Sequence, residues 1–587
     1  MCIHRGSGFS GMRRGQPPEG GPTTGRVAIQ LNRVFPFLNW PRITWLSFRD
    51  DAIAGITVAL VAVPQSLAYA QLAGVPPQYG LYAAFIPSIV GVLFGSSGIL
   101  STGPVAMTSL LTAASVSALV PPGTEQFYAY VTLLALLSGL FQFGFGLARA
   151  GLLLSLVSHP VLMGFINAAA LIIAMAQLPG LVGIASTQSE RLLVDTWSVI
   201  ARIGTLHGMS LAFGATAIAM FVAFRRFAPR LPGMLLTVGI LIGVSHVVGF
   251  ADRGGSVVGS IPAGFPGLGV PALGWSTIAA LLPAAFVIAL VSFMEAASSC
   301  KVIAIKTRVR WDENQELVGQ GLAKIAAAFC QSIPVSGSFS RSALNLASNA
   351  RTGLSSLVCA ACVLVTLLFF TPLLFDLPKP VLAAAIILAV FGLIDVTVFR
   401  RAWLASREDG LAAIATFVAT LAFAPNIQNG LLTGIIVSLA AYLYGRMRPR
   451  VEVIGVPANG SNPESAAVVA PLHSTIGALR FDAALYFANV SYFEQAVLAL
   501  ERNNPEIRYI IIIANGINSL DASGVEMVRN LAEHLRQSGI TLILTDVKKH
   551  VQEVIDRTGL IATLGSANIF ATAGAAIESL RTRGGSG

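Results

Sequence analysis

Charged residues are scarce in this 587-residue sequence. Asp, Glu, Lys and Arg together make up 11% of it, against roughly 25% in an ordinary soluble protein. Hydrophobic residues make up 54%, and apolar stretches of about 20 residues recur between Ala52 and Gly445, each long enough to cross a hydrocarbon core of about 30 Å. The composition excludes a soluble globular fold and predicts a polytopic α-helical membrane protein in contact with a lipid bilayer.

Cysteine is also rare, with five residues in the chain. Cys359 and Cys362 lie inside an apolar stretch without a second pair or a nearby His, so we predict that they pack between helices and bind no metal. No nucleophile–base pair, phosphate loop or metal cluster is evident, so we predict neither an enzyme nor a bound cofactor. The net charge of +10 comes without a basic stripe that contains aromatics, and no nucleic-acid partner is predicted.

Fourteen segments are predicted to enter the membrane. The segments beginning at Pro104 and Phe339 follow Gly-Pro or Ser-Gly breakers and contain many Ser, Thr and Asn residues, so they are predicted to be half-helices preceded by unwound backbone. The predicted segments begin near Ala52, Tyr79, Pro104, Ala129, Ser158, Gly208, Met234, Ile278, Glu313, Phe339, Gly353, Val381, Gly410 and Gly430.

The loop charges predict the orientation. Basic residues such as Arg149, Arg225, Lys306 and Arg400 fall in loops on the side of the N-terminal tail, whereas the opposite loops contain few. With an even number of spans, the positive-inside rule places both termini in the cytoplasm. We therefore predict a multi-pass protein of the cell inner (plasma) membrane.

The two half-helices are third in the first seven segments and third in the second seven. Broken helices at matching positions of two halves indicate an inverted repeat with a substrate site near the midplane of the membrane. An odd, seven-helix unit must be inverted when it is duplicated. The sequence thus predicts a 7+7 inverted repeat in which the two half-helices meet.

The candidate substrate site lies at these half-helices. Their first turns, which include Val105 and Ala106 in one and Ser340 in the other, present free N–H groups and roughly half a positive charge each. Arg341 adds a full charge, and an Arg near mid-bilayer costs about 2.5–3.5 kcal/mol unless it has a partner. A substrate anion is our preferred partner for Arg341; the structural alternative is pairing with carbonyl groups or with Glu295.

Three further positions complete the candidate site. Glu295 is a second costly charge inside an apolar stretch, with Ser299 four residues later on the same helix face; we predict that Glu295 loads a proton, or with Ser299 a sodium ion, together with the anion. The alternative is a structural counter-charge for Arg341. Gln65 and Tyr69 share one face of the first span and could hydrogen-bond an oxyanion.

After Gly445 the sequence is typical of a small α/β domain. Residues 507–514 and 541–545 are predicted strands, and 525–537 an amphipathic helix. Ser523, with Glu526 three residues later, is predicted to form a capping box. The functional alternative for Ser523 is a regulatory, phosphorylatable serine.

These motifs resemble the sulfate permease (SulP) family with its C-terminal STAS domain, a family that includes prestin and plant sulfate transporters. Residues 55–80 (GITVALVAVPQSLAYAQLAGVPPQYG) resemble its signature, and 101–110 and 336–346 its half-helix motifs. The resemblance implies core and gate domains, a homodimer, elevator-like movement and a STAS domain that can bind a regulatory partner. It also implies anion contacts by Gln65, Tyr69, Ser340 and Arg341.

The resemblance bears on the coupling ion as well. Family symporters carry an acidic residue at the position of Glu295, and their sodium-binding branch has Asp and Thr where this chain has Glu295 and Ser299. Glu and Ser here favour protons over sodium. Ser523 matches the phosphorylated serine of anti-sigma factor antagonists.

We therefore expect a secondary active transporter of inorganic oxyanions, with sulfate:proton symport as the leading interpretation. Sodium–bicarbonate symport, chloride/bicarbonate exchange and dicarboxylate transport are the alternatives. The expected domains are a cytosolic tail (1–47), a transmembrane transporter domain (48–446), a linker (447–464), a cytosolic STAS domain (465–582) and a C-terminal tail (583–587).

Overall fold

A computed structural model describes residues 35–151, 157–184, 201–202, 204, 206–228, 231–271, 273–424, 426–457, 469–471 and 475–584. Most of the predicted N-terminal tail, residues 458–464 of the predicted linker and the last three residues lie outside the described residues. The chain divides into two compact units, Met1–Val437 and Ser438–Gly587. Each unit is described by itself.

The first unit is helical, and every one of the fourteen predicted segments corresponds to a helix. Two short elements were not predicted, the 3₁₀ turn η1 (Pro36–Asn39) and the amphipathic helix α15 (Thr397–Ala405). The fourteen helices are α2 (Trp45–Leu72), α3 (Pro77–Phe94), α4 (Ala106–Ser117), α5 (Glu125–Leu147), α6 (His159–Val182), α8 (Gly208–Phe227), α9 (Gly233–Val248), α10 (Trp275–Thr307), α11 (Glu313–Phe329), α12 (Phe339–Ala347), α13 (Leu354–Val365), α14 (Lys379–Phe391), α16 (Arg407–Ala422) and α17 (Ile427–Met447).

Eight helices among the described residues are long and apolar enough to cross a membrane, counting α13 together with η4 (Thr366–Phe370) and η5 (Thr371–Leu374) as one helix of 21 residues. The expectation of stretches of about 20 residues is wrong for α9, α11, α14 and α16, which have 16, 17, 13 and 16 residues. The other two, α4 and α12, are short, as the prediction of half-helices requires. At about 1.5 Å per residue, α4 and α12 extend only about 18 and 14 Å. Both follow short extended segments, as predicted, and these segments are buried in protein.

Small residues allow the helices of the first unit to pack closely. A Cβ atom at Gly321 of α11 would lie 2.5 Å from the backbone nitrogen of Phe143 in α5, and one at Gly139 would lie 2.9 Å from the Gly321 carbonyl oxygen. Backbones that approach this closely are typical of membrane helices, where small residues replace hydrophobic burial as the basis of association. The close α5–α11 contact holds α11 against the centre of the unit.

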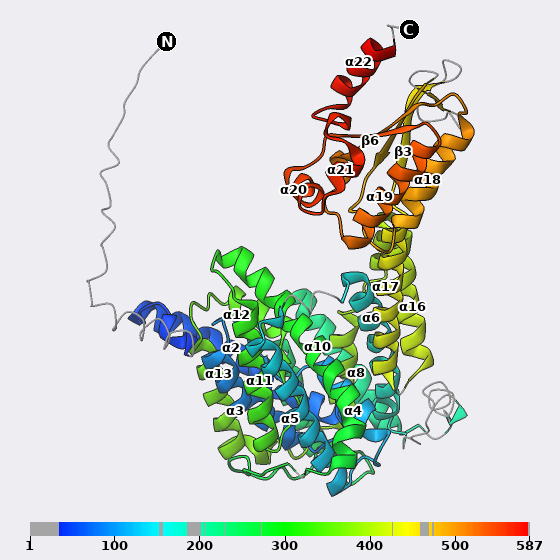
Figure 1. The fold of residues 1–587 in the computed structure, drawn as a ribbon. Helices are drawn as coiled ribbons and strands as arrows, with labels where there is room; N and C mark the ends of the chain where they lie inside the picture. The colour runs from blue at the N-terminus through cyan, green and yellow to red at the C-terminus, as the bar shows by residue number, and fades with distance from the viewer. Residues whose placement is uncertain are drawn as a thin grey trace, which may run out of the picture. The chain divides into compact units, whose positions relative to one another are not determined.

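The second unit is a small α/β domain (Figure 1). Its six-stranded sheet has the order β4-β3-β5-β6-β7-β8. β5 to β8 are parallel, and β3 is antiparallel to both β4 and β5. Its strands are β3 (Val451–Pro457), β4 (Val469–Pro471), β5 (Ile476–Phe481), β6 (Tyr509–Ile513), β7 (Thr541–Thr545) and β8 (Ile569–Phe570). Its helices are α18 (Val490–Asn503), α19 (Ala522–Gln537), α20 (Lys549–Arg557), α21 (Leu560–Leu564) and α22 (Ala573–Gly584), with the 3₁₀ turns η6 (Ala514–Gly516) and η7 (Ser566–Asn568).

Strand alternation divides the apolar residues of this sheet between its two faces. Ile510 and Ile512 of β6 pack into a cluster with residues of α18, α19, α20 and α21. Ile511, between them, packs on the opposite face with Ala576 and Leu580 of α22. The continuous apolar run of β6 is thus buried on both faces, as a central parallel strand requires.

Two details of this unit differ from the expectation. Residues 451–457, expected within the linker, form β3, because 451–454 pair antiparallel with β5 and 455–457 pair antiparallel with β4. The predicted capping box of Ser523 and Glu526 is wrong. The N-cap of α19 is Asp521, whose Oδ1 accepts a hydrogen bond of 2.7 Å from the Gly524 N–H, and Ser523 is an exposed residue of the first turn.

Candidate functional site

The two half-helices of the first unit meet through their preceding strands. β1 (Thr102–Gly103) pairs antiparallel with β2 (Ser336–Gly337), with Thr102 opposite Gly337 and Gly103 opposite Ser336. The N–H of Ser338 donates to the Ser101 carbonyl oxygen at 2.8 Å and extends the pairing. Since α4 and α12 begin within three residues of these strands, their N-termini come together at one place, as the sequence predicts.

Arg341 extends across this pairing. Its guanidinium is almost completely buried (2% exposed), and Nη1 donates a hydrogen bond of 2.9 Å to the Pro104 carbonyl oxygen in the opposite segment. Nη2 is buried and has no hydrogen-bond partner. A Cβ atom at Gly103 would lie 2.9 Å from Nη2, so a side chain at this position would displace the guanidinium. Arg341 therefore keeps free donor capacity for a ligand.

The first turns of the half-helices differ in their caps. α4 has no side-chain cap at its N-cap residue Val105, and both Val105 and Ala106 are buried. In α12 the Ser338 hydroxyl accepts from the Arg341 N–H at 3.4 Å, and Ser340 is exposed with its hydroxyl 3.4 Å from that of Ser338. Uncapped N–H groups at a buried helix start favour an anion.

Glu295 and Tyr69 each interact electrostatically with Arg341. The Oε2 atom of Glu295 is buried without a hydrogen-bond partner, and Tyr69 is buried on α2. Ser299 is buried too, but its hydroxyl donates to the backbone carbonyl of Glu295 at 3.0 Å. The structure therefore brings Tyr69, Glu295 and Arg341 together, while the Ser299 hydroxyl bonds the helix backbone.

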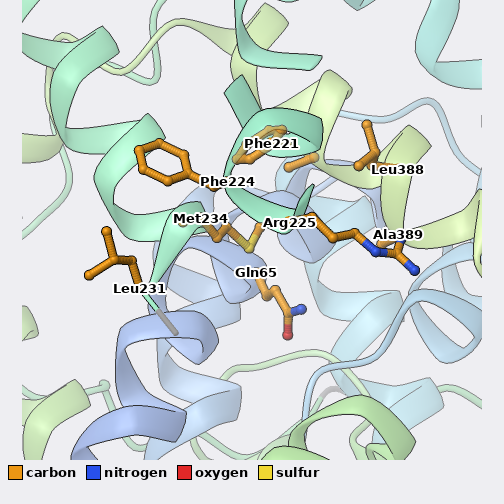
Figure 2. Close-up of a pocket in the computed structure, with 10 residues that line it drawn as sticks. Gln65, Phe221, Phe224, Arg225, Leu231, Met234, Leu388 and Ala389 are labelled. Atoms are coloured by element: carbon orange, nitrogen blue, oxygen red, sulfur yellow. The ribbon is translucent and has the colours of Figure 1, made fainter. Parts of the chain in front are cut away.

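Gln65 lies one helical turn before Tyr69 and lines a pocket of about 320 Å³. Figure 2 shows its amide with the side chain of Arg225 and apolar side chains around them. The pocket is formed by α2, α8, α9 and α14. The structure thus places Gln65 at a cavity whose lining includes no residue of β1, α4, β2 or α12, and no described hydrogen bond joins Gln65 to Arg341.

A buried lysine beside Glu295 was not predicted. Lys324 of α11 is fully buried, and its ammonium donates to Gln142 Oε1 and, at 2.8 Å, to Ser292 Oγ. Glu295 is the charged group with which it interacts electrostatically. A lone Lys in the run Gly321–Phe329 is a signal that could have found it, because ionisable residues at membrane depth are functional candidates by default.

A second buried network holds the strand pairing in place. Glu316 Oε2 accepts from the N–H groups of Ser96 and Ser97 at 2.9 and 3.0 Å, and Oε1 accepts from Gln320 at 3.0 Å. Gln320 also donates to Thr102 Oγ1 at 2.8 Å. These polar residues lower the hydropathy of α11, and their hydrogen bonds support β1.

Comparisons with known proteins agree with this architecture. Residues 48–416 match the family model described as the sulfate permease family, and residues 467–576 match the STAS domain. The Arabidopsis thaliana protein named "Sulfate transporter 4.1, chloroplastic" is 31% identical over 570 residues, which cover 93% of this chain and 82% of that protein.

Two solved structures show the same fold. The structure of SLC26A9 superposes with a TM-score of 0.87 at 20% identity and covers 98% of each chain. The transmembrane domain of a cyanobacterium bicarbonate transporter, BicA, superposes with a TM-score of 0.58 at 24% identity and covers 68% of this chain and 98% of the other.

The predicted fold is therefore confirmed: a polytopic helical membrane protein of the SLC26 fold that carries a small α/β STAS domain. The family consists of transporters and not of enzymes. The half-helices are paired, and a buried arginine lies where they meet. Since both of its domains also match the family models, the chain belongs to the sulfate permease family of anion transporters.

Proposed function

We propose that this chain is a proton-coupled importer of an inorganic oxyanion, with sulfate as substrate. The observation that carries the proposal is Arg341: its Nη2 is buried, lacks a partner and lies where two half-helices begin. A buried cation with spare donors beside electropositive helix ends favours a doubly charged, tetrahedral oxyanion. The name of the Arabidopsis thaliana relative supports sulfate among the oxyanions.

Each predicted site residue of the membrane domain except Ser299 has a role in this proposal. Arg341 and the N–H groups of Val105, Ala106 and Ser340 bind the oxyanion, and the Tyr69 hydroxyl donates to it. Gln65 contacts the anion as it passes from the pocket that this residue lines. Glu295 accepts the coupled proton, because its Oε2 is buried without a donor and the charge is otherwise costly there.

The transport cycle follows from the two-part architecture that the family resemblance implies. A core that contains the half-helices moves relative to a gate and exposes the site to either side in turn, in an elevator-like alternating-access cycle. We further propose that the protein is a homodimer in the plasma membrane with cytoplasmic termini, and that its STAS domain binds a regulatory partner. Exposed Ser523 is available to a kinase in this proposal.

The test is uptake of labelled sulfate into liposomes that contain the purified full chain. An inward proton gradient should accelerate uptake and an inward sodium gradient should not. Arg341→Gln should lower sulfate uptake by roughly tenfold or more, because a charge-assisted anion contact is lost. Arg351→Gln is the matched control, since the Arg351 guanidinium is half exposed and pairs with Asp50.

Glu295→Gln separates the coupling ion from the anion. Sulfate uptake by this variant should become insensitive to pH while the anion still binds. Unchanged proton dependence in Glu295→Gln would exclude Glu295 as the proton site. Uptake of bicarbonate that requires sodium, with no uptake of sulfate, would instead favour the sodium–bicarbonate alternative. Proton-independent chloride or dicarboxylate exchange would contradict symport.

A further inference from the structure

Three charged side chains surround the candidate anion site, and their sum determines which anion it can hold. Arg341 of α12 and Lys324 of α11 are basic residues. The Glu295 carboxylate of α10 interacts electrostatically with both of them. Tyr69 of α2 is the other titratable neighbour of this carboxylate. The helix α4 and the strand β2 also pack on α10 and contain no charged residue. The helix α5 packs on α10 too, and its one charged residue is Glu125 in its first turn.

The side chain of Lys324 is held by two hydrogen-bond acceptors. Gln142 Oε1 is an acceptor, and the Ser292 hydroxyl donates its own hydrogen to the Ala289 carbonyl oxygen at 3.2 Å. Both partners therefore accept hydrogen bonds from Lys324. The Lys324 nitrogen contacts these two acceptors, and the described ion pairs include none between Lys324 and Glu295.

The same hydrogen bonds connect Lys324 to β2, next to which the two half-helices meet. Ser292 accepts from Lys324 through its hydroxyl, and its backbone carbonyl accepts from the Ser336 hydroxyl of β2 at 2.8 Å. Lys324 is thus tied to the strand that leads into α12 and Arg341. Its position relative to the site is maintained by hydrogen bonds and by the close α5–α11 packing.

The three charges add up to +1 when Glu295 is ionised and Lys324 is protonated, since two cations and one carboxylate give 2 − 1. A bound divalent anion changes the sum to −1, and one proton on Glu295 returns it to zero. Without Lys324, the same neutral state would be reached by one monovalent anion and one proton. Net charge is costly in a buried, low-dielectric site, so the loaded site should be neutral.

We propose that Lys324 is a specificity-determining residue whose buried charge lets the site take a divalent oxyanion together with a single proton. This inference rests on the proposed function and deepens it. In this proposal Lys324 does not touch the anion. Its charge acts on the anion through the electrostatic balance of the site. The helix N-termini contribute equally in all charge states and leave the balance unchanged.

The experiment measures binding of labelled sulfate and labelled nitrate to the purified full chain between about pH 5 and 8. The wild type should prefer sulfate and bind it more tightly at low pH. Lys324→Met should bind nitrate, still with better binding at low pH, and lose sulfate affinity by roughly tenfold or more. Lys301→Met is the matched control, because Lys301 is an exposed lysine of α10 and should keep the preference for sulfate.

A double variant tests the charge balance of the site directly. Glu295→Gln alone leaves +2, so sulfate should bind without a proton. Glu295→Gln with Lys324→Met leaves +1, so nitrate should be preferred and its binding should be independent of pH. Binding of nitrate by either Lys324 variant also shows that the variant is folded.

The possible failures are distinguishable. A wild type that binds no sulfate, or binds it equally at every pH, contradicts the proposed function. A wild type that behaves as expected, with a Lys324→Met variant that still prefers sulfate, overturns this inference alone. Loss of both anions from Lys324→Met and from the double variant overturns it as well, because the charge balance requires that nitrate binding survives.

Discussion

Gly103 is the residue that gives the Arg341 guanidinium room at the half-helix crossing. We expect Gly103→Ala to lower the affinity for sulfate by roughly tenfold, since the added Cβ would lie 2.9 Å from Nη2 and the guanidinium must move. The measurement is sulfate binding by the purified chain. Gly144→Ala in α5 is the control, because nothing lies within 4 Å of the added Cβ, and it should bind like the wild type.

The charged residues of the site differ in how far the sequence predicts them. Arg341 and Glu295 stand out because each interrupts an apolar run, where a charge must have a reason. Lys324 is equally costly, but the polar residues of α11 around it obscure the signal. The sequence cannot give the bond from Arg341 to Pro104, because the two residues are 237 positions apart and meet only through the fold.

At the scale of elements, the start of α2 is joined to the segment before α13 by one buried carboxylate. Asp51 accepts from the Thr352 hydroxyl at 2.6 Å and from the Arg351 N–H at 2.7 Å. Thr352→Val should destabilise the protein by about 1–3 kcal/mol, because a buried oxygen loses its donor. The readout is the thermal unfolding temperature of the purified full chain.

Thr57→Val provides the comparison for that change. The Thr57 hydroxyl bonds the Ile53 carbonyl oxygen within α2 and joins no second element, so its loss should alter the unfolding free energy by no more than about 0.5 kcal/mol. Equal effects of the two substitutions would show that Asp51 does not hold the two segments together.

The cap of α19 gives a second prediction at this scale. Asp521→Ala should destabilise the STAS domain by about 0.5–2 kcal/mol, because the Gly524 N–H loses its acceptor. Urea unfolding of a fragment that begins after α17, residues 448–587, would measure it. Ser523→Ala should change stability by no more than about 0.5 kcal/mol, since Ser523 is exposed. A larger effect of Ser523→Ala would mean that the serine is the cap.

Three elements of the second unit, β6, α19 and β7, were predicted from the sequence, and the cap of α19 was not. Residues 541–545 form β7 as expected, because an apolar β-branched run bounded by turns has few alternatives. For α19, Asp521 and Ser523 both suit an N-cap, and the spacing to Glu526 favoured the serine. The choice depends on backbone geometry: Asp521 has extended dihedrals and Ser523 is already helical.

At the scale of the whole molecule, the distribution of basic loops predicts the orientation. Green fluorescent protein fused to the C-terminus should fluoresce in the cytoplasm of bacterial cells. Alkaline phosphatase, which needs disulfides, should be inactive when fused after Met447 and active when fused at Gly254 in the loop after α9, which the loop charges place outside. The reverse pattern would invert the proposed topology.

The overall architecture was predictable because membrane insertion depends on local hydropathy, which a single sequence contains. The lengths of the helices were less predictable from the sequence. The π and 3₁₀ turns η4 and η5 carry α13 on to Leu374, and α14 is only 13 residues long. Such lengths depend on what each helix packs against, and burial within protein relaxes the demand for a full span.

The strand pairing at the crossing has a consequence for biosynthesis. While the ribosome is still making the first half of the chain, β1 has no β2 to pair with, and the backbone before α4 must wait unpaired in the translocon or the bilayer. Only after α12 has been translated can the two strands join. The pocket for the anion therefore forms late, and a nascent chain that stalls before Ser336 exposes an unfinished polar segment that quality-control proteases can recognise.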